Sequence, residues 1–260
     1  WKITKNEVSS SKGVVASQHW IASSVGADVM AKGGNAIDAA IACAFALNVV
    51  EPWMCGLGGS GYIVIWLAKS KTAKVIDFQG TLPNYIKIED YPLDPQMPET
   101  TMGFSGVKNQ GNTLGYRSIT VPGSVSGLAT ALENYGTLGL DSVLSKTIEL
   151  AERGLLVDWH TTLQIAIETL DLKKFSTSSE IYLPNGVPPK PEQLLKLGNL
   201  PNTLKRISEN GAGEFYQGKL AEEIASDLQK GGSRITIDDL ASYEPLFISP
   251  LVSSHRGKKL

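Results

Sequence analysis

The string GLGGSG at residues 56–61 matches the pattern G-x-G-x-x-G, which in dinucleotide-binding proteins lets the backbone approach a pyrophosphate. That chemistry needs a loop that leaves a strand and enters a helix, because the N–H groups of the helix N-terminus bind the phosphates. Here the order is reversed. Residues 35–50 are an Ala-rich run typical of a buried helix with Asn35 as N-cap, and residues 62–68 are an apolar, β-branched run typical of a buried strand. The glycines therefore indicate a turn with close backbone packing rather than a nucleotide site.

The other residues that could do chemistry form no catalytic set. Cys43 lies inside the Ala-rich run and is expected to be a buried structural thiol, whereas Cys55 has no histidine nearby in sequence to activate it. The acidic pair Asp238 and Asp239 is explained by a helix N-terminus, where carboxylates are stabilised by the helix dipole. The histidines lack metal-ligand spacing and are expected at the surface or in helix caps; they are His19, His160 and His255.

The composition indicates a folded protein and argues against several partners. Of the 260 residues, 42% are hydrophobic and 19% are charged, which is typical of globular domains and not of disordered chains. A net charge of −2 gives no electrostatic reason to expect binding to nucleic acid or to an anionic membrane. No apolar run reaches the roughly 18 residues that span a bilayer, since residues 36–50 are too few and include Asp38.

The elements that must position these residues are a few early strands and many helices. Strands are expected at 13–18, 62–68 and 73–78, the last two as an antiparallel hairpin. Helices are expected at 20–32, 36–50, 125–136, 140–154, 157–175, 190–209, 218–232 and 235–243.

Two features refine this pattern. Residues 81–116 are rich in Pro, Gly, Asn and Thr without periodicity, and loops of that length tend to be functional or mobile. Thr236 precedes Asp239 by three residues, as in a capping box. Long amphipathic helices with few strands predict a broad helical layer packed on a sheet, an α+β arrangement.

Six stretches carry a pattern that extends over most of residues 13–257. They are AKGGNAIDAAIACAFALNVVEP, GLGGSGYIVIW, VIDF, VPGSVSG, NGAGEFYQGKLAEEIASDLQKGG and ITIDDLASY. In this order they resemble the large chain of the γ-glutamyltransferases (γ-glutamyltranspeptidases) of the N-terminal-nucleophile hydrolase superfamily. The resemblance implies an α+β fold, the four-layer αββα sandwich, to which this chain supplies the N-terminal strands and most of the helices. It also implies that the glycine turn serves packing between a buried helix and a core strand.

The resemblance accounts for the missing nucleophile. Members of this family are made as one inactive precursor that cuts itself into a large and a small chain, and the new N-terminal Thr of the small chain attacks the amide carbonyl. The α-amino group of that Thr, with an unperturbed pKa of about 7.7–8.0, can take the hydroxyl proton. The resemblance thus implies no catalytic residue in this chain, no metal and no cofactor. It predicts that residues 1–260 are a single domain, the large-chain part of a heterodimer completed by a small chain from the same precursor.

One departure from the family pattern concerns the substrate. After the core strand, γ-glutamyl enzymes carry an F-R-E-like string whose Arg binds the substrate's α-carboxylate, whereas this chain has DFQG, with Gln79 at the Arg position and Gly80 at the acid position. Gln cannot form the charged bidentate pair, and this loss weakens carboxylate binding by about 10- to 100-fold. We expect Gln79 at the mouth of the acyl pocket, with room for a ligand beside Gly80. Arg117 is the alternative source of positive charge.

The expected reaction is acyl transfer through a threonine ester to water or an amine, of the glutathione hydrolase type. Alternatives are a relative that acts on another amide, such as oxamate or a cephalosporin-type side chain, a binding protein that lost catalysis, and, least favoured, a nucleotide-dependent enzyme. The expected partners are the small chain and a small-molecule amide. A dimer of heterodimers is one alternative for the oligomeric state. The chain starts at Trp1 rather than Met, so a removed leader stays open, as do cytoplasmic and periplasmic or secreted locations.

Overall fold

The chain is mainly helical, with few and short strands. The computed structural model describes residues 7–99 and 103–259. The first half contains α1 (Trp20–Ala31), α2 (Ala36–Val50), β1 (Tyr62–Leu67), β2 (Thr72–Asp77), α3 (Ser124–Tyr135) and α4 (Leu140–Arg153). The second half contains β3 (Leu155–Leu156), α5 (Trp159–Ile167), α6 (Thr169–Leu172), α7 (Ser176–Tyr182), β4 (Leu194–Leu195), α8 (Leu200–Asn210), α9 (Gly213–Tyr216), α10 (Lys219–Lys230), α11 (Ile237–Ala241), β5 (Leu246–Ile248), β6 (Ser254–His255) and β7 (Lys258–Lys259). None of the helices in the described ranges has both the length and the apolar character to cross a bilayer.

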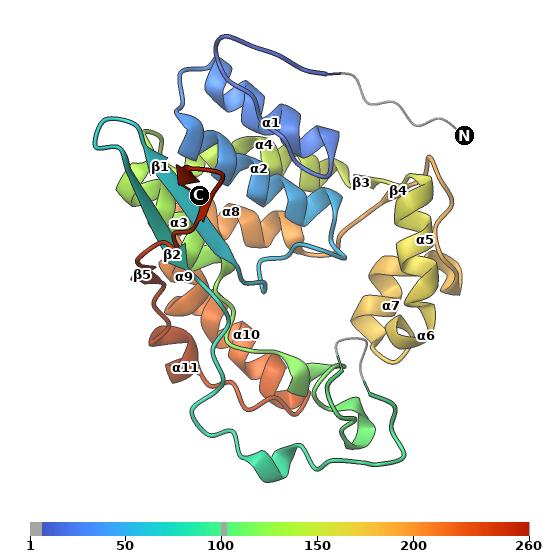
Figure 1. Cartoon of the computed structure of the whole chain (residues 1–260). Coiled ribbons are helices and arrows are strands. Elements are labelled where there is room, and N and C mark those ends of the chain that lie inside the picture. Colours follow the sequence, from blue (N-terminus) through green and yellow to red (C-terminus); the bar gives the residue numbers. More distant parts are fainter. Residues whose placement is uncertain (1–6, 100–102, 260) are drawn as a thin grey trace.

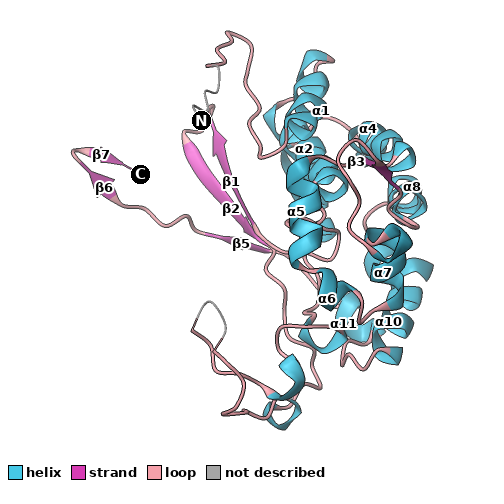
Figure 2. Ribbon diagram, turned by 90° about the vertical axis from the view of Figure 1, so that its right-hand side faces the viewer, coloured by secondary structure: helices cyan, strands magenta, loops and turns pink. Residues whose placement is uncertain are grey.

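A three-stranded antiparallel sheet of order β1-β2-β5 stands beside the helices. The predicted hairpin is confirmed: β1 and β2 pair from Tyr62 opposite Asp77 to Leu67 opposite Thr72. β5, from near the end of the chain, pairs with the other edge of β2. Figures 1 and 2 show α1, α2, α4 and α8 as a stack on one side of this sheet. The α+β character predicted from the sequence is confirmed.

The outer face of the hairpin is exposed, so the prediction that residues 62–68 are fully buried is wrong for this chain. Side chains of a strand alternate between two faces, and the described helices cover only one of them (Figure 2). Ile65 and Ile76 are 3% and 0% exposed on the helix side. On the outer face, three apolar side chains of β1 are 59–72% exposed, namely Tyr62, Val64 and Trp66. Val75 of β2, which lies opposite Val64, is 7% exposed.

Helix α2 is buried along most of its length, as its Ala-rich sequence predicts. Asn35 caps its N-terminus, and its side chain accepts hydrogen bonds from the Ile37 and Asp38 backbone N–H groups. Asp38 is 0% exposed and also accepts hydrogen bonds from Thr137 N and Oγ1, at 2.8 and 2.6 Å, and from Leu138 N, at 3.1 Å. Asp38 therefore ties α2 to the segment that leads into α4.

The glycine turn packs against the start of α3. The Gly59 carbonyl accepts hydrogen bonds from the backbone N–H groups of Gly123, at 2.9 Å, and Ser124, at 3.0 Å. A Cβ atom on Gly61 would lie 3.0 Å from the Phe78 ring. These contacts support the prediction of a packing role, because α3 approaches the turn with its first backbone N–H groups.

Several predicted boundaries are wrong. Residues 13–18 form no strand in the described part of the chain, and the region 157–175 is divided into shorter helices. The helix predicted at 190–209 begins only at Leu200, because residues 190–199 form a turn and the short strand β4, which pairs with β3. Pro201 lies in the first turn of α8, where a proline costs no intrahelical hydrogen bond.

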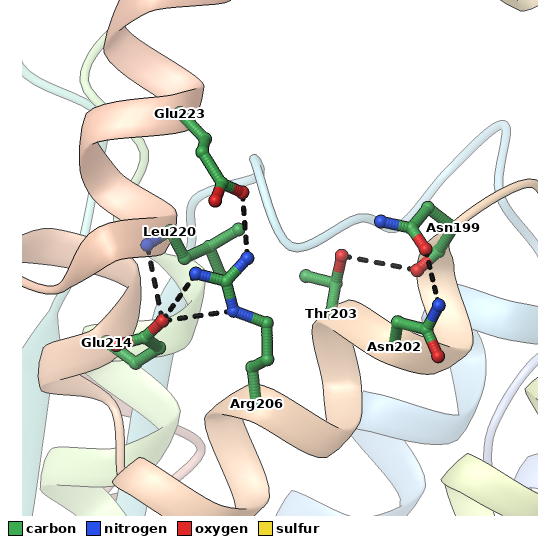
Figure 3. A network of polar contacts seen from close by, with 7 residues as sticks. All are labelled: Asn199, Asn202, Thr203, Arg206, Glu214, Leu220 and Glu223. Atoms are coloured by element: carbon green, nitrogen blue, oxygen red, sulfur yellow. Dashed lines mark hydrogen bonds and ion pairs between the residues drawn. The ribbon is translucent and has the colours of Figure 1, made fainter.

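A polar network joins α8, α9 and α10 (Figure 3). Arg206 of α8 donates through Nε and Nη2 to Glu214 Oε1, at 3.0 and 2.7 Å, and through Nη1 to Glu223 Oε2, at 2.7 Å. Glu214 Oε1 also accepts from Leu220 N near the start of α10. A planar guanidinium can serve two carboxylates at once, so this network sets the relative position of the three helices.

Candidate substrate site

Gln79 lies just beyond the end of β2 and takes part in three hydrogen bonds. Its backbone N–H donates to Asp77 Oδ1 at 2.9 Å. Its carbonyl oxygen accepts a 2.9 Å hydrogen bond from the Tyr243 hydroxyl. Its side-chain Oε1 accepts a weaker, 3.4 Å hydrogen bond from Ser60 Oγ in the glycine turn. The side chain is exposed. Because Oε1 already accepts from Ser60, the amide NH2 group is the part of the side chain that can donate a hydrogen bond to a ligand.

Tyr243 belongs to a pair of buried tyrosines. Its ring stacks on that of Tyr216, with centroids 5.7 Å apart. The Tyr216 hydroxyl donates to the Pro122 carbonyl at 2.9 Å and accepts from Ser126 N at 3.1 Å. Burial, together with the negative charge of Asp77, raises the pKa of Tyr243 to about 12, and burial also raises the pKa of Tyr216. Both hydroxyl groups are therefore protonated donors at neutral pH.

The space beside Gly80 is occupied by Thr120. A Cβ atom on Gly80 would lie 2.1 Å from Thr120 Oγ1 and 2.9 Å from its Cβ. The neighbouring residues Thr81 and Val121 form an isolated antiparallel bridge that holds the two segments together. Thr120 thus fills the space where a side chain at position 80 would lie. Gly80 also lines a cleft together with Gln79, so the room for a ligand beside Gln79 stays a prediction. Glycine is required here because the two backbones approach closely.

A cleft of about 500 Å³ opens beside Gln79. Its walls are formed by Asp77, Gln79, Gly80, Thr81, Leu82, Asn84, Val121, Asp239, Ser242, Tyr243, Glu244 and Leu246. Three of these residues are acidic and none of them is Lys or Arg. The lining of this cleft therefore suits a neutral or cationic polar group, and it offers no cation of this chain to a carboxylate.

Asp239 lines this cleft, but its carboxylate caps α11 and binds a neighbouring loop. It is 4% exposed, and its carboxylate accepts hydrogen bonds from Thr236 N and Oγ1, at 2.8 and 2.7 Å, and from Asn84 N, at 2.9 Å. Burial raises the pKa of Asp239, but these hydrogen bonds outweigh it and hold the pKa below its ordinary value. The predicted capping box is confirmed, and it explains this carboxylate without a catalytic role.

Arg117 lines a different cleft from Gln79. That second cleft measures about 450 Å³ and shares Leu82 with the first one. Arg117 Nη2 donates to the Asp90 carbonyl, and its guanidinium lies 5.2 Å from the centre of the Tyr91 ring. The structure thus holds the two predicted substrate-binding residues in neighbouring clefts and does not bring them together.

The cysteines and His19 offer no nucleophile. Burial raises the pKa of the Cys43 thiol, and burial together with the charge of Glu51 raises that of Cys55, so neither thiolate is favoured. His19 is the N-cap of α1: its Nδ1 accepts from Ile21 N at 3.2 Å, and burial lowers its pKa. No group of three or more His, Cys, Asp and Glu side chains within residues 7–99 and 103–259 is arranged to bind a metal ion.

Sequence reasoning missed the residues that position Gln79. Ser60 could have been predicted from the sequence, because it lies inside the string GLGGSG. Tyr243 follows a recognisable capped helix, yet no local signal shows that its hydroxyl contacts a residue 164 positions earlier. Thr120 has no signal of its own in the sequence.

Comparisons with known proteins agree with this fold. The family model for gamma-glutamyltranspeptidase matches residues 22–260. A glutathione hydrolase proenzyme from Bacillus subtilis subsp. natto is 35% identical over 254 residues, which cover 95% of this chain and 41% of that protein. The acylase ACY 1 proenzyme of Pseudomonas sp. (strain SE83) is 34% identical over 256 residues, covering 98% of this chain and 45% of that protein.

The solved structures give the same result. The crystal structure of Helicobacter pylori gamma-glutamyltranspeptidase superimposes with a TM-score of 0.88 and 33% identity, covering 98% of this chain and 70% of that chain. The chain spans less than half the length of the two curated relatives. Its α+β architecture is that of the N-terminal-nucleophile hydrolases, as predicted. By sequence and by structure, the chain belongs to the γ-glutamyltranspeptidase family.

Proposed function

We propose that this chain is the large-chain part of a γ-glutamyltransferase-like amide hydrolase or acyltransferase, of the glutathione hydrolase type. The observation that carries the proposal is the family match over residues 22–260, together with the proenzyme relatives. In this proposal residues 1–260 are a single domain that a small chain from the same precursor completes. The substrate is a small-molecule amide.

The proposed reaction uses the N-terminal Thr of the small chain. Its hydroxyl oxygen attacks the amide carbon while its α-amino group takes the hydroxyl proton. Collapse of the tetrahedral intermediate breaks the C–N bond, and the proton passes to the leaving amine. Water or an acceptor amine then attacks the ester carbon and gives a proton to the α-amino group. The bond between the acyl carbon and the Thr hydroxyl oxygen breaks, that oxygen takes the proton back, and the acyl group leaves as an acid or a new amide. In this proposal the present chain contributes residues that bind the substrate and form the walls of the substrate cleft.

The exposed outer face of the hairpin supports the partner in this proposal. Tyr62, Val64 and Trp66 form an apolar strip on a sheet that the described helices cover on one side only. A sheet with one uncovered apolar face is stabilised by a second layer. In this proposal the small chain supplies that layer.

Gln79 is proposed as an acyl-site residue that favours a neutral polar acyl group. Its amide lies at the edge of a cleft that contains acidic residues and no Lys or Arg. An enzyme with this site should process γ-glutamyl amides poorly, since a neutral donor replaces a charged one. This observation also favours the second candidate, an amide hydrolase of the same family with another acyl group, in keeping with the acylase relative.

The test is the kcat/KM of the mature two-chain enzyme on a γ-glutamyl anilide. Gln79→Arg should raise this value by about 10- to 100-fold, whereas the neutral Gln79→Met should not. A wild-type enzyme that is already efficient and loses activity on Gln79→Arg would show that the carboxylate is bound elsewhere. In that case Arg117→Gln is the next variant. Absence of the N-terminal Thr from the mature small chain would favour the binding protein over the enzyme.

A further inference from the structure

The second cleft, which contains Arg117, has the features of a ligand site. It is formed by the loop between β2 and α3, at the bottom of Figure 1, and its volume of about 450 Å³ lies within the about 300–1,000 Å³ typical of small-molecule pockets. Its walls are mainly apolar and include Leu82, Ile86, Ile88, Tyr91 and Ile119. Ile88 is 85% exposed and therefore accessible to a ligand.

Arg117 is held in place at this cleft by its neighbours. Its Nη2 donates to the Asp90 carbonyl, and its guanidinium lies over the Tyr91 ring, 5.2 Å from the ring centre. The Tyr91 hydroxyl in turn donates to the Arg117 carbonyl at 2.7 Å. A side chain held by a carbonyl and a ring has lost most of its freedom, so a ligand would bind to it at a small cost in entropy.

The positive charge at the cleft is not neutralised. The Asp90 carboxylate, which interacts electrostatically with Arg117 without a salt bridge, pairs with Arg234 Nη2 at 2.7 Å and accepts from Lys87 N at 3.1 Å. Among the described residues neither Arg117 nor Lys87 forms a salt bridge. Both cations line the cleft, and no acidic residue does. Two unpaired cations beside apolar walls complement a ligand with an apolar body and an anionic end.

The cleft adjoins the site around Gln79. Thr120, one of its lining residues, is the side chain packed against Gly80, and Leu82 lines both clefts. A substrate whose reacting amide lies near Gln79 could therefore extend over Thr120 into the second cleft. The charge separation between the clefts, acidic beside Gln79 and basic beside Arg117, would orient such a substrate.

We propose that the second cleft binds the part of the substrate that is distant from the reacting amide. This part is an aromatic or aliphatic group that ends in a carboxylate. This inference rests on the proposed amide hydrolase function, because it names the substrate class of that same enzyme. Arg117 binds the carboxylate, Lys87 adds positive charge, and the apolar body contacts Ile88 and Ile119.

The test measures binding of two probes to the mature two-chain enzyme by calorimetry. The probes are 4-phenylbutyrate and its neutral counterpart 4-phenylbutanamide. The carboxylate should bind the wild type about 10-fold or more tightly than the amide, because a charge-assisted hydrogen bond replaces a neutral one. Arg117→Gln should remove this preference and leave amide binding unchanged. Ile88→Asp should weaken both probes.

Lys108→Gln is the matched control, since it removes a cation from the same loop outside the cleft. It should preserve the preference for the carboxylate. Equal affinity of the wild type for both probes, or equal effects of Arg117→Gln and Lys108→Gln, would overturn the proposal. Failure of both probes to bind would also overturn it and would indicate that the small chain covers the cleft. Because binding needs no turnover, these outcomes are separate from a failure of the proposed reaction.

Discussion

The Tyr243 hydroxyl donates a 2.9 Å hydrogen bond to the backbone carbonyl of Gln79, across 164 positions of sequence. Tyr243 follows α11, and Gln79 follows β2. The bond therefore joins the segment after the last helix to the end of the central strand, where the proposed acyl site begins. The stacked Tyr216 ring and its bond to the Pro122 carbonyl restrict Tyr243 further, so Tyr243 is a positioning residue for Gln79.

Tyr243→Phe should lower kcat/KM for the enzyme's amide substrate by about 2- to 10-fold, the effect of losing one neutral hydrogen bond. The loss should be mainly in KM, since Gln79 would be less well placed for binding. Tyr135→Phe is a suitable control, because none of the described residues forms a hydrogen bond with the Tyr135 hydroxyl. A loss confined to the melting temperature, with unchanged kinetics, would contradict the positioning role.

The same tyrosine predicts a loss of stability at high pH. Its pKa in the folded protein is about 12, whereas an unfolded tyrosine titrates near about 10. The unfolded state therefore releases its proton first, and the stabilising contribution, complete below about pH 10, is lost as the pH rises through about 12. Urea titrations at pH 8 and 10.5 should show that wild type loses more stability than Tyr243→Phe. Equal losses would show that other groups control the alkaline transition.

Gly80 and Thr120 should be energetically coupled. Gly80→Ala places a methyl group where Thr120 Oγ1 now lies, and overpacking of this kind costs about 1–3 kcal/mol. In a Thr120→Ala background the cost should be smaller, and a double-mutant cycle of unfolding free energies measures the difference. Gly58→Ala is the control, because a Cβ there meets nothing within 4 Å. Additive effects would refute close packing. The same contact predicts that Gln79→Arg combined with Gly80→Glu will fold poorly.

Asp38→Asn should destabilise the chain by about 3 kcal/mol. Both carboxylate oxygens accept hydrogen bonds from donors, so an amide group would turn its NH2 toward an N–H or O–H group and leave a buried donor unpaired. Asp227→Asn, which changes an exposed carboxylate on α10, should have little effect. Thermal or urea unfolding gives the comparison. A small change for Asp38→Asn would mean that water replaces the lost acceptor.

The pH dependence of Asp38 follows from the same hydrogen bonds. Burial raises the pKa of the carboxyl, but the hydrogen bonds outweigh it, so the pKa of Asp38 lies below its ordinary value. A depressed folded pKa means that the stabilisation is complete above the unfolded value of about 3.9 and is lost as the pH falls through the folded one. The stability gap between wild type and Asp38→Asn should therefore be constant at neutral pH and shrink below about pH 4. A gap that persists in strong acid would contradict the assignment.

The outer face of the hairpin should be needed for assembly. Val64→Lys places a charge in the centre of the exposed apolar strip, and burying it against a second layer would be costly. The full-length precursor with this change should form the two-chain enzyme poorly, as followed by gel analysis of cleavage and by size exclusion. Val187→Lys changes another exposed valine, away from the sheet, and should assemble normally. Normal assembly of Val64→Lys would place the small chain elsewhere.

The sequence by itself determined the local structures. Asn35 is the predicted N-cap of α2, Thr236 and Asp239 form the predicted capping box of α11, and the two β-rich runs pair as a hairpin. These features depend on residues a few positions apart, so their signals lie within one stretch of chain. The family can be recognised from the sequence because each of its motifs is a continuous stretch of residues.

The tertiary structure decided which residues meet at the site. Tyr243 reaches Gln79, Thr120 fills the space at Gly80, and Arg117 lies in a neighbouring cleft, although nothing in their local sequence distinguishes these outcomes. The exposure of one face of residues 62–68 is a further outcome of this kind, because an apolar strand does not show which of its two faces another layer covers. Such contacts arise when helices pack on a sheet, and packing depends on the shapes of distant segments together rather than on the propensity of any one of them.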